Sequence, residues 1–202
     1  MMGGNIMDTM DIKDMIHFYD GLRSYRKFQQ KKIPEEILHG IIECVRLAPS
    51  GSNRQKLRFV VVESDEKLKE LQPLVNYAAV LPKEVGTPKE NEQPAAFIVI
   101  VKEPGTDMNL QMDAGISAEA IVTAAWSQGI GCVMMGNIQY KEIAKVLGVG
   151  EKDVVLAIAM GYPAIESHVV PVPEDGKTSY YLDNDGNYCV PKYSVEQLAK
   201  FI

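Results

Sequence analysis

Residues 112–137 read MDAGISAEAIVTAAWSQGIGCVMMGN, a pattern that predicts a long helix followed directly by a strand-like segment. Alanine, glycine and serine lie all around the circumference of the predicted helix, 112–128. Small side chains let another backbone approach closely, so we expect this helix to be buried on most sides, at the centre of the fold or in a dimer interface. An ordinary core helix explains the same pattern equally well.

The segments on either side of this helix predict an α+β fold. Three runs of β-branched, aromatic and other apolar residues have the composition of buried strands, at 59–62, 95–101 and 154–160. Further helices are expected at 8–22, from Pro34 until Pro49, at 65–71 after the cap Ser64, at 143–147, and from the capping box of Ser194 and Gln197 to Phe201. This mixture favours a mostly antiparallel central sheet flanked by helices.

Length and composition indicate one globular domain, 1–202. The chain has 202 residues, of which 46% are hydrophobic and 24% charged, enough to build a sizeable apolar core. Residues 80–94 combine prolines, a glycine and several charges, so we expect a loop or lid over a site there. Residues 164–202 are expected to form a C-terminal extension.

Charge and hydropathy exclude two classes of partner. The formal net charge is -6 and the lysines and arginines are spread along the chain, which argues against nucleic acid. The longest apolar run, 95–101, is far shorter than the roughly 20 residues that cross a bilayer, so no membrane partner is expected. Residues 1–14 lack the basic start and apolar stretch of a secretory signal, and the expected location is the cytoplasm.

The cysteines and histidines give no sign of a metal site. The cysteines are odd in number and have no CxxC spacing, which predicts free structural thiols at Cys44, Cys132 and Cys189. The histidines are far apart in the sequence and are expected at the surface or in hydrogen bonds, at His17, His39 and His168. We therefore expect no bound metal.

Three other segments carry residues suited to binding a ligand. In 22–28, three cations and a serine hydroxyl follow a helix, a set that can clamp an anion or a carbonyl, although a solvated basic turn has the same composition. In 48–55, serine, asparagine and glutamine offer the donors and acceptors that match the edge of a pyrimidine-like ring. In 129–137 the glycines follow a helix, which excludes a Rossmann loop, and Gly136 suits a backbone that approaches a flat ring.

In this order and separation, the three segments resemble the nitroreductase family of flavoproteins. The resemblance covers about 14–163, with a similar tail at 183–194. Two motifs carry it: Arg23-Ser24-x-Arg26-x-Phe28 is similar to the family's Arg-Ser-x-Arg signature, and Pro49-Ser50-Gly51-x-Asn53-x-Gln55 to its Pro-Ser-Gly-x-Asn-x-Gln loop. Asp113-Ala114-Gly115, the Gly-x-Gly helix exit and Gly161-Tyr162-Pro163 are similar as well.

The resemblance implies the FMN-dependent nitroreductase fold, an intertwined homodimer with two flavins at the subunit interface. It also implies the ligands of FMN. The ribityl chain, phosphate and pyrimidine carbonyl meet Arg23, Ser24 and Arg26. The loop near the ring supplies Ser50, Asn53 and Gln55, and backbone groups near the ring atoms N5 and O4 come from Met135 and Gly136.

The chain departs from the family pattern in three places. Leu22 and Leu182 stand where the family usually carries arginine near the FMN phosphate, and Lys56-Leu57 replaces a frequent Pro-Trp pair. Missing charge-assisted hydrogen bonds predict that FMN binds loosely. Another cation would restore the clamp, and the candidates are Arg23, Arg26, Lys27 and Lys192.

The activity that the resemblance implies is that of an NAD(P)H-dependent flavin oxidoreductase. Such an enzyme transfers hydride by a ping-pong mechanism to a nitroaromatic, a quinone or a similar electrophilic acceptor. The flavin carries the chemistry, so we name no catalytic acid, base or nucleophile among the side chains. The alternatives are a reductive dehalogenase or flavin-fragmenting enzyme of the same fold, and a flavin-binding protein with weak turnover, which the missing arginines favour.

Overall fold

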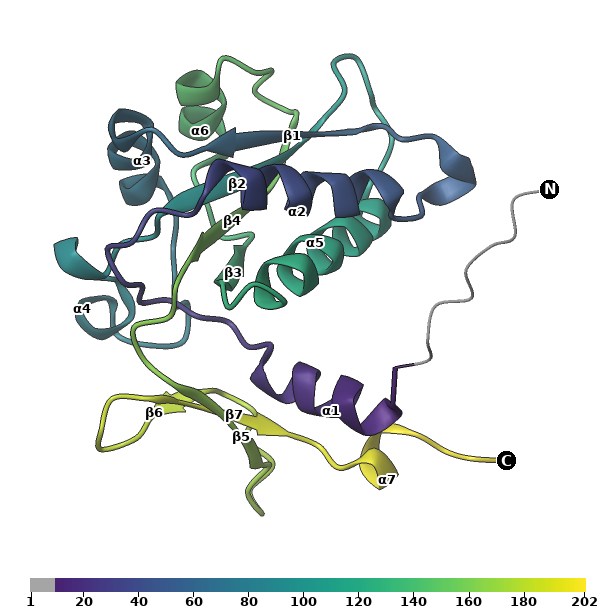
Figure 1. Cartoon of the computed structure of the whole chain (residues 1–202), viewed down its shortest axis with the longest axis vertical. Helices are drawn as coiled ribbons and strands as arrows, with labels where there is room; N and C mark the ends of the chain where they lie inside the picture. The colour runs from purple at the N-terminus through teal and green to yellow at the C-terminus, as the bar shows by residue number, and fades with distance from the viewer. Residues whose placement is uncertain (1–9) are drawn as a thin grey trace.

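The computed structural model describes residues 10–202, and its centre is a four-stranded sheet. The strands are β1 (Leu57–Val62), β2 (Ala96–Lys102), β3 (Gly131–Met135) and β4 (Val154–Gly161), in the spatial order β1-β2-β4-β3. Every neighbouring pair is antiparallel, which confirms the predicted α+β sheet (Figure 1). The runs predicted as strands are β1, β2 and β4, and the strand-like segment after the long helix is β3.

The two central strands carry the core. All residues from Ala96 to Ile100 in β2 and from Ala157 to Met160 in β4 have 0% exposed surface. The prediction that β1 is equally buried is wrong, because β1 is one of the two outer strands of the sheet and Val61 on it is 36% exposed. An outer strand lies at the rim of the covering layers, so its apolar run overstates its burial.

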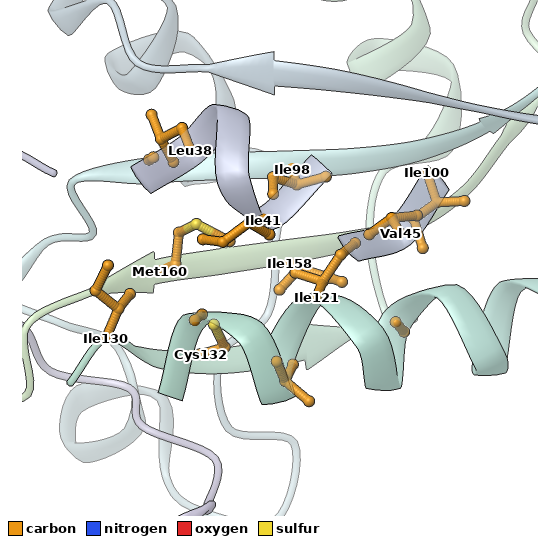
Figure 2. Packing of buried hydrophobic residues seen from close by; sticks show 14 of the residues in the cluster. Leu38, Ile41, Val45, Ile98, Ile100, Ile121, Ile130, Cys132, Ile158 and Met160 are labelled. Atoms are coloured by element: carbon orange, nitrogen blue, oxygen red, sulfur yellow. The ribbon is translucent and has the colours of Figure 1, made fainter. Parts of the chain in front are cut away.

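Helices α2 (Glu35–Leu47) and α5 (Gln111–Trp126) cover one face of the sheet. The apolar residues of α2 recur every third or fourth position and form one stripe. This stripe packs on isoleucines of β2, β4 and α5 (Figure 2), and the contact joins Leu38, Ile41 and Val45 with Ile98, Ile100, Ile158 and Ile121.

The central helix α5 is buried on one side only. Ala114, Ala118 and Ala125 are at most 4% exposed, whereas Met112 is 80% exposed. Gly115 is exposed too. Within residues 10–202 of one chain, α5 is therefore not buried on most sides, in contrast to the prediction.

The opposite face of the sheet is covered by α3 (Asp65–Leu71), α6 (Tyr140–Leu147) and the segment 25–28. Ser64 caps α3 as predicted, by accepting a hydrogen bond from the backbone N–H of Lys67. The predicted lid, 80–94, is not wholly irregular. It contains the short helix α4 (Lys83–Gly86) and a 3-10 turn at Glu90–Glu92, and a further 3-10 turn at Gln72–Leu74 precedes it.

The C-terminal residues build a second sheet of three strands, β5 (Ser167–Pro171), β6 (Tyr181–Leu182) and β7 (Tyr188–Lys192). The middle strand, β7, runs parallel to β5 and antiparallel to β6. Helix α7 (Val195–Leu198) begins with the predicted capping box, but the prediction that it reaches Phe201 is wrong, because the backbone of Ala199 is already extended.

Helix α1 (Ile12–Gly21) lies against β5 and is largely exposed (Figure 1). It begins after Asp11, whose carboxylate accepts a hydrogen bond from the backbone N–H of Lys13; residues 8 and 9 of the predicted helix lie outside the described residues. No residue of α1 is buried, and Ile12 and Ile16 are 69% and 63% exposed. In the part of the chain that the structure describes, no helix has the length and apolarity to span a bilayer.

The cysteines are free thiols, as predicted, with Cys132 and Cys189 buried and Cys44 exposed. Burial raises the pKa of the Cys132 thiol well above its ordinary value. His39 and His168 lie on the surface beside glutamates, at 3.6 Å and 3.2 Å from the nearest carboxylate oxygen.

Candidate functional site

The basic segment 22–26 lies along the open edge of the central sheet. Ser24 forms a parallel bridge with Cys132 of β3, and the backbone N–H of Tyr25 donates to the Cys132 carbonyl at 2.9 Å. Close packing supports this pairing, because a Cβ on Gly131 would lie 2.6 Å from the Tyr25 ring. The sheet therefore holds the side chains of this segment next to β3.

A cavity of about 420 Å³ opens beside this pairing, and we call it the β3-edge cavity. Its walls come from segment 22–26, from α5, from Cys132 and Met134 of β3, and from the C-terminal sheet, which contributes Tyr180 and Lys192. Arg23, Ser24 and Arg26 all line it. The structure thus brings together the predicted residues of the first motif.

Arg26 is a buried cation, only 7% exposed. Its Nε donates to the Tyr77 carbonyl at 2.7 Å and its Nη1 to the Ser24 carbonyl at 3.0 Å. Within residues 10–202 no carboxylate forms an ion pair with it. Burying a charge without an opposite charge is costly, so an anionic or carbonyl ligand in the cavity would compensate it.

Arg23 offers a donor that the described residues leave unused. Its guanidinium donates through Nη2 to the Tyr19 carbonyl, but its Nε is buried and has no acceptor. A buried donor without a partner costs about 1–3 kcal/mol. An acceptor inside the cavity, such as a phosphate or hydroxyl oxygen, would satisfy it.

Lys192 is the third cation of the cavity, and it lies at the end of β7. It too lacks an ion pair with a described carboxylate, whereas Lys27 lies 4.0 Å from Glu92 and does not line the cavity. The carboxylate of Glu119, which does line it, accepts hydrogen bonds from the hydroxyls of Tyr19 and Thr123 instead. Among the four candidate cations, the structure places Arg23, Arg26 and Lys192 in one cavity and Lys27 elsewhere.

The second motif forms a strained loop. The backbone N–H of Gly51 donates to Oδ1 of Asp113 at 2.9 Å, which ties the loop to the start of α5. Ser52, Asn53 and Gln55 have φ values of 52°, 54° and 51°, a region where each non-glycine residue costs on the order of 1–3 kcal/mol. Such strain clusters at functional sites.

This loop does not reach the β3-edge cavity of its own chain. It is held at Asp113, whereas the cavity touches α5 at Glu119 and Val122, which lie about 9 and 13 Å further along the helix. Figure 1 shows the loop near the end of α5 where the helix begins, and β3 near the end where it stops. Within one chain, Ser50, Asn53 and Gln55 therefore lie apart from the residues of the first motif, and their role near the flavin ring stays a prediction.

The third motif points its side chains in two directions. Met135 is 3% exposed and belongs to the cluster on the far face of the sheet, whereas Met134 is 46% exposed and lines the cavity. Gly136 follows β3 at the surface, where its carbonyl accepts a hydrogen bond from the Tyr140 hydroxyl at 2.6 Å. Only backbone groups of Met135 and Gly136 are therefore available to a ligand at this edge.

Asp113→Ala should loosen the strained loop. It removes the acceptor of the Gly51 N–H, a hydrogen bond to a charged group worth roughly 1.5–3 kcal/mol, so the loop should open about tenfold more often or more. Trypsin cleavage after Arg54 in the native protein should accelerate by a similar factor. Asp107→Ala, at an exposed residue outside this contact, is the matched control, and equal cleavage of the two variants would contradict the role of Asp113.

Comparisons with known proteins agree with this geometry. The model of the nitroreductase family matches residues 21–162. A protein of Archaeoglobus fulgidus, provisionally named an NADH dehydrogenase/NAD(P)H nitroreductase, is 30% identical over 154 residues, 71% of this chain and 82% of the relative. The FMN reductase (NAD(P)H) of Bacillus subtilis is 25% identical over 189 residues, 81% of this chain and 72% of its own.

A solved structure shows the same fold. The FMN-dependent nitroreductase of Clostridium difficile R20291 superposes with a TM-score of 0.63 at 27% identity, covering 76% of this chain and 90% of its own. The matched residues 21–162 include segment 22–26, the strained loop and β3. By sequence and by fold, the chain belongs to the nitroreductase family.

Proposed function

We propose that this chain is an NAD(P)H-dependent FMN oxidoreductase that reduces nitroaromatic, quinone or similar electrophilic acceptors by ping-pong hydride transfer. The observation that carries the proposal is the charge of the β3-edge cavity. Three cations line it, and the buried Nε of Arg23 has no acceptor within residues 10–202. An anionic ligand with several oxygen atoms meets both requirements, and a flavin phosphate with its ribityl chain is such a ligand.

The residues present fit FMN at this place. Arg23, Ser24 and Lys192 would hold the ribityl chain and the phosphate, and Arg26 would face the pyrimidine carbonyl. When bound, the flavin supplies the acceptance of hydride from the nicotinamide and its delivery to the acceptor. The chain orients the flavin and keeps water away from it, and apolar side chains of Val122, Met134 and Val190 form part of the wall.

The names of the relatives support the cofactor and the reductant. One of the relatives described above is an FMN reductase with NAD(P)H in its name, and the solved structure is that of an FMN-dependent nitroreductase. FMN as cofactor and NAD(P)H as reductant are therefore the simplest assignment for this chain.

Reconstitution with FMN tests the proposal. After incubation with FMN and desalting, the absorption spectrum should show one protein-bound flavin per chain, and menadione should accelerate the oxidation of NADH or NADPH. Only free flavin after desalting would contradict the proposal. Bound FMN without menadione-dependent oxidation would support the flavin-binding protein with weak turnover instead.

Lys192→Met should weaken the binding of FMN and leave that of riboflavin unchanged. The variant loses one charge-assisted hydrogen bond to phosphate, worth roughly 1.5–3 kcal/mol, or about a tenfold higher Kd at least. Riboflavin has no phosphate. Fluorescence-quenching titrations of both flavins at matched ionic strength measure the difference, with Lys200→Met as control. An equal loss for the two flavins would show that Lys192 does not meet the phosphate.

We infer that the protein is a homodimer in which the strained loop of one chain completes the β3-edge cavity of the other. Two observations support this arrangement. The loop and the cavity lie at different ends of α5 within one chain. In addition, α5 leaves Met112 exposed and α1 leaves Ile12 and Ile16 exposed, which is apolar surface that a second chain would cover.

Mixed dimers test this arrangement. Arg23→Ala with Ser24→Ala disables the cavity, and Asn53→Ala with Gln55→Ala disables the loop, so dimers of either variant alone should bind FMN weakly. A mixed dimer holds one intact site, and co-expressed chains with two different tags should recover about half of the wild-type sites. Sedimentation of the wild type checks the dimer itself. Failure of the mixed dimer to bind FMN would mean that each chain completes its own site.

A further inference from the structure

We propose that Tyr180, backed by Tyr188, is a positioning residue that fixes the guanidinium of Arg26 in the β3-edge cavity. The C-terminal extension would then be a working part of the flavin site, although it lies outside the residues that match the family. The inference rests on the proposed function, because it takes Arg26 to face the flavin.

The two tyrosine rings form a corner into which Arg26 fits. The carbon at the centre of the guanidinium lies 4.2 Å from the centroid of the Tyr180 ring and 4.9 Å from that of Tyr188. The rings meet edge to face, with their centroids 5.9 Å apart and an angle of 62° between their planes. Both distances are within the roughly 6 Å at which a cation is attracted to the face of an aromatic ring.

The other contacts of Arg26 leave little freedom. The carbonyls of Tyr77 and Ser24 accept hydrogen bonds from Nε and Nη1 of Arg26. The hydrogen bonds of the described residues do not use Nη2. Two carbonyls and two rings therefore set the direction in which this remaining edge of the guanidinium points.

Tyr180 and Tyr188 differ in burial and in their other contacts. Tyr188 has 0% exposed surface, and the described part of the chain offers its buried hydroxyl no hydrogen-bond partner, so it is also part of the core of the C-terminal sheet. Tyr180 is only partly buried and lines the cavity itself. A change at Tyr180 therefore removes one ring face from Arg26 and leaves the core of the small sheet in place.

The position of Arg26 matters because of the charge that a flavin gains on reduction. A cation held near the pyrimidine carbonyl stabilises negative charge on the reduced ring, and this effect falls with distance and mobility. If Tyr180 fixes Arg26, removing its ring should weaken the binding of reduced FMN more than that of oxidised FMN. The redox potential of bound FMN then becomes more negative.

Tyr180→Leu and Tyr180→Phe form the decisive pair of variants. Tyr180→Leu should bind oxidised FMN several-fold less tightly and shift the potential of bound FMN by about -30 mV, which equals a tenfold difference between the oxidised and reduced forms for a two-electron couple. Tyr180→Phe keeps the ring face and should match the wild type in both. Tyr181→Leu is the matched control, because the neighbouring Tyr181 is 50% exposed and does not line the cavity.

The outcomes separate this inference from the proposed function. A wild type that does not bind FMN overturns both. A wild type that binds FMN, with an unchanged affinity and potential in Tyr180→Leu, overturns the positioning role alone. The same holds if Tyr180→Phe fails like Tyr180→Leu, or if Tyr181→Leu shows an equal shift. If Tyr180→Leu does not fold, Tyr180→Gln is measured in its place, and failure of both to fold shows a structural role and overturns the inference.

Discussion

The candidate site depends on one backbone pairing, that of segment 22–26 with the open edge of β3. The bridge of Ser24 with Cys132, in which the Tyr25 N–H donates to the Cys132 carbonyl, fixes this segment beside β3. Next to this bridge Arg23, Ser24 and Arg26 line the cavity, while Tyr25 turns away from it and stacks on Trp126 at a centroid distance of 5.3 Å. Without this pairing, the residues of the first motif would form a basic turn with no common direction.

Electrostatics explains why Arg26 is surrounded by carbonyl oxygens and aromatic rings. A guanidinium that is 7% exposed and has no carboxylate partner among the described residues needs other sources of negative potential. Carbonyl oxygens and the faces of aromatic rings supply it without neutralising the charge. A carboxylate in the same place would compete with a phosphate or a ring carbonyl. Glu119, the acidic residue of the cavity, forms no ion pair with Arg26, and its carboxylate accepts hydrogen bonds from the hydroxyls of Tyr19 and Thr123.

The sequence predicted those features of the fold that depend on residues close together along the chain. The unbroken run of β2, the cap at Ser64 and the capping box at Ser194 follow from short segments, and the structure confirms each of them. The relation between the strained loop and the cavity depends on the length of α5 and on the proposed second chain, so local patterns do not define it, and the role of the loop near the flavin ring stays a prediction. Tyr180 approaches Arg26 from more than 150 positions along the sequence, and no motif marks it. The position of Met134 in the cavity wall could have been predicted from the sequence, because side chains alternate in β3 and Met134 lies on the same face as Cys132.

The missing arginines show how a sequence motif and a site can differ. The attraction between a cation and a phosphate depends on their distance and surroundings and not on which segment carries the cation. Leu22 removes a charge from the segment that matches the family, and Lys192 brings one to the same cavity from β7, which lies beyond the matched residues. The C-terminal sheet can therefore replace a charge that the signature lost, provided that contacts such as those of Tyr180 with Arg26 hold the sheet against the cavity. In a chain of this kind, the loss of a signature arginine does not by itself indicate the loss of the cofactor.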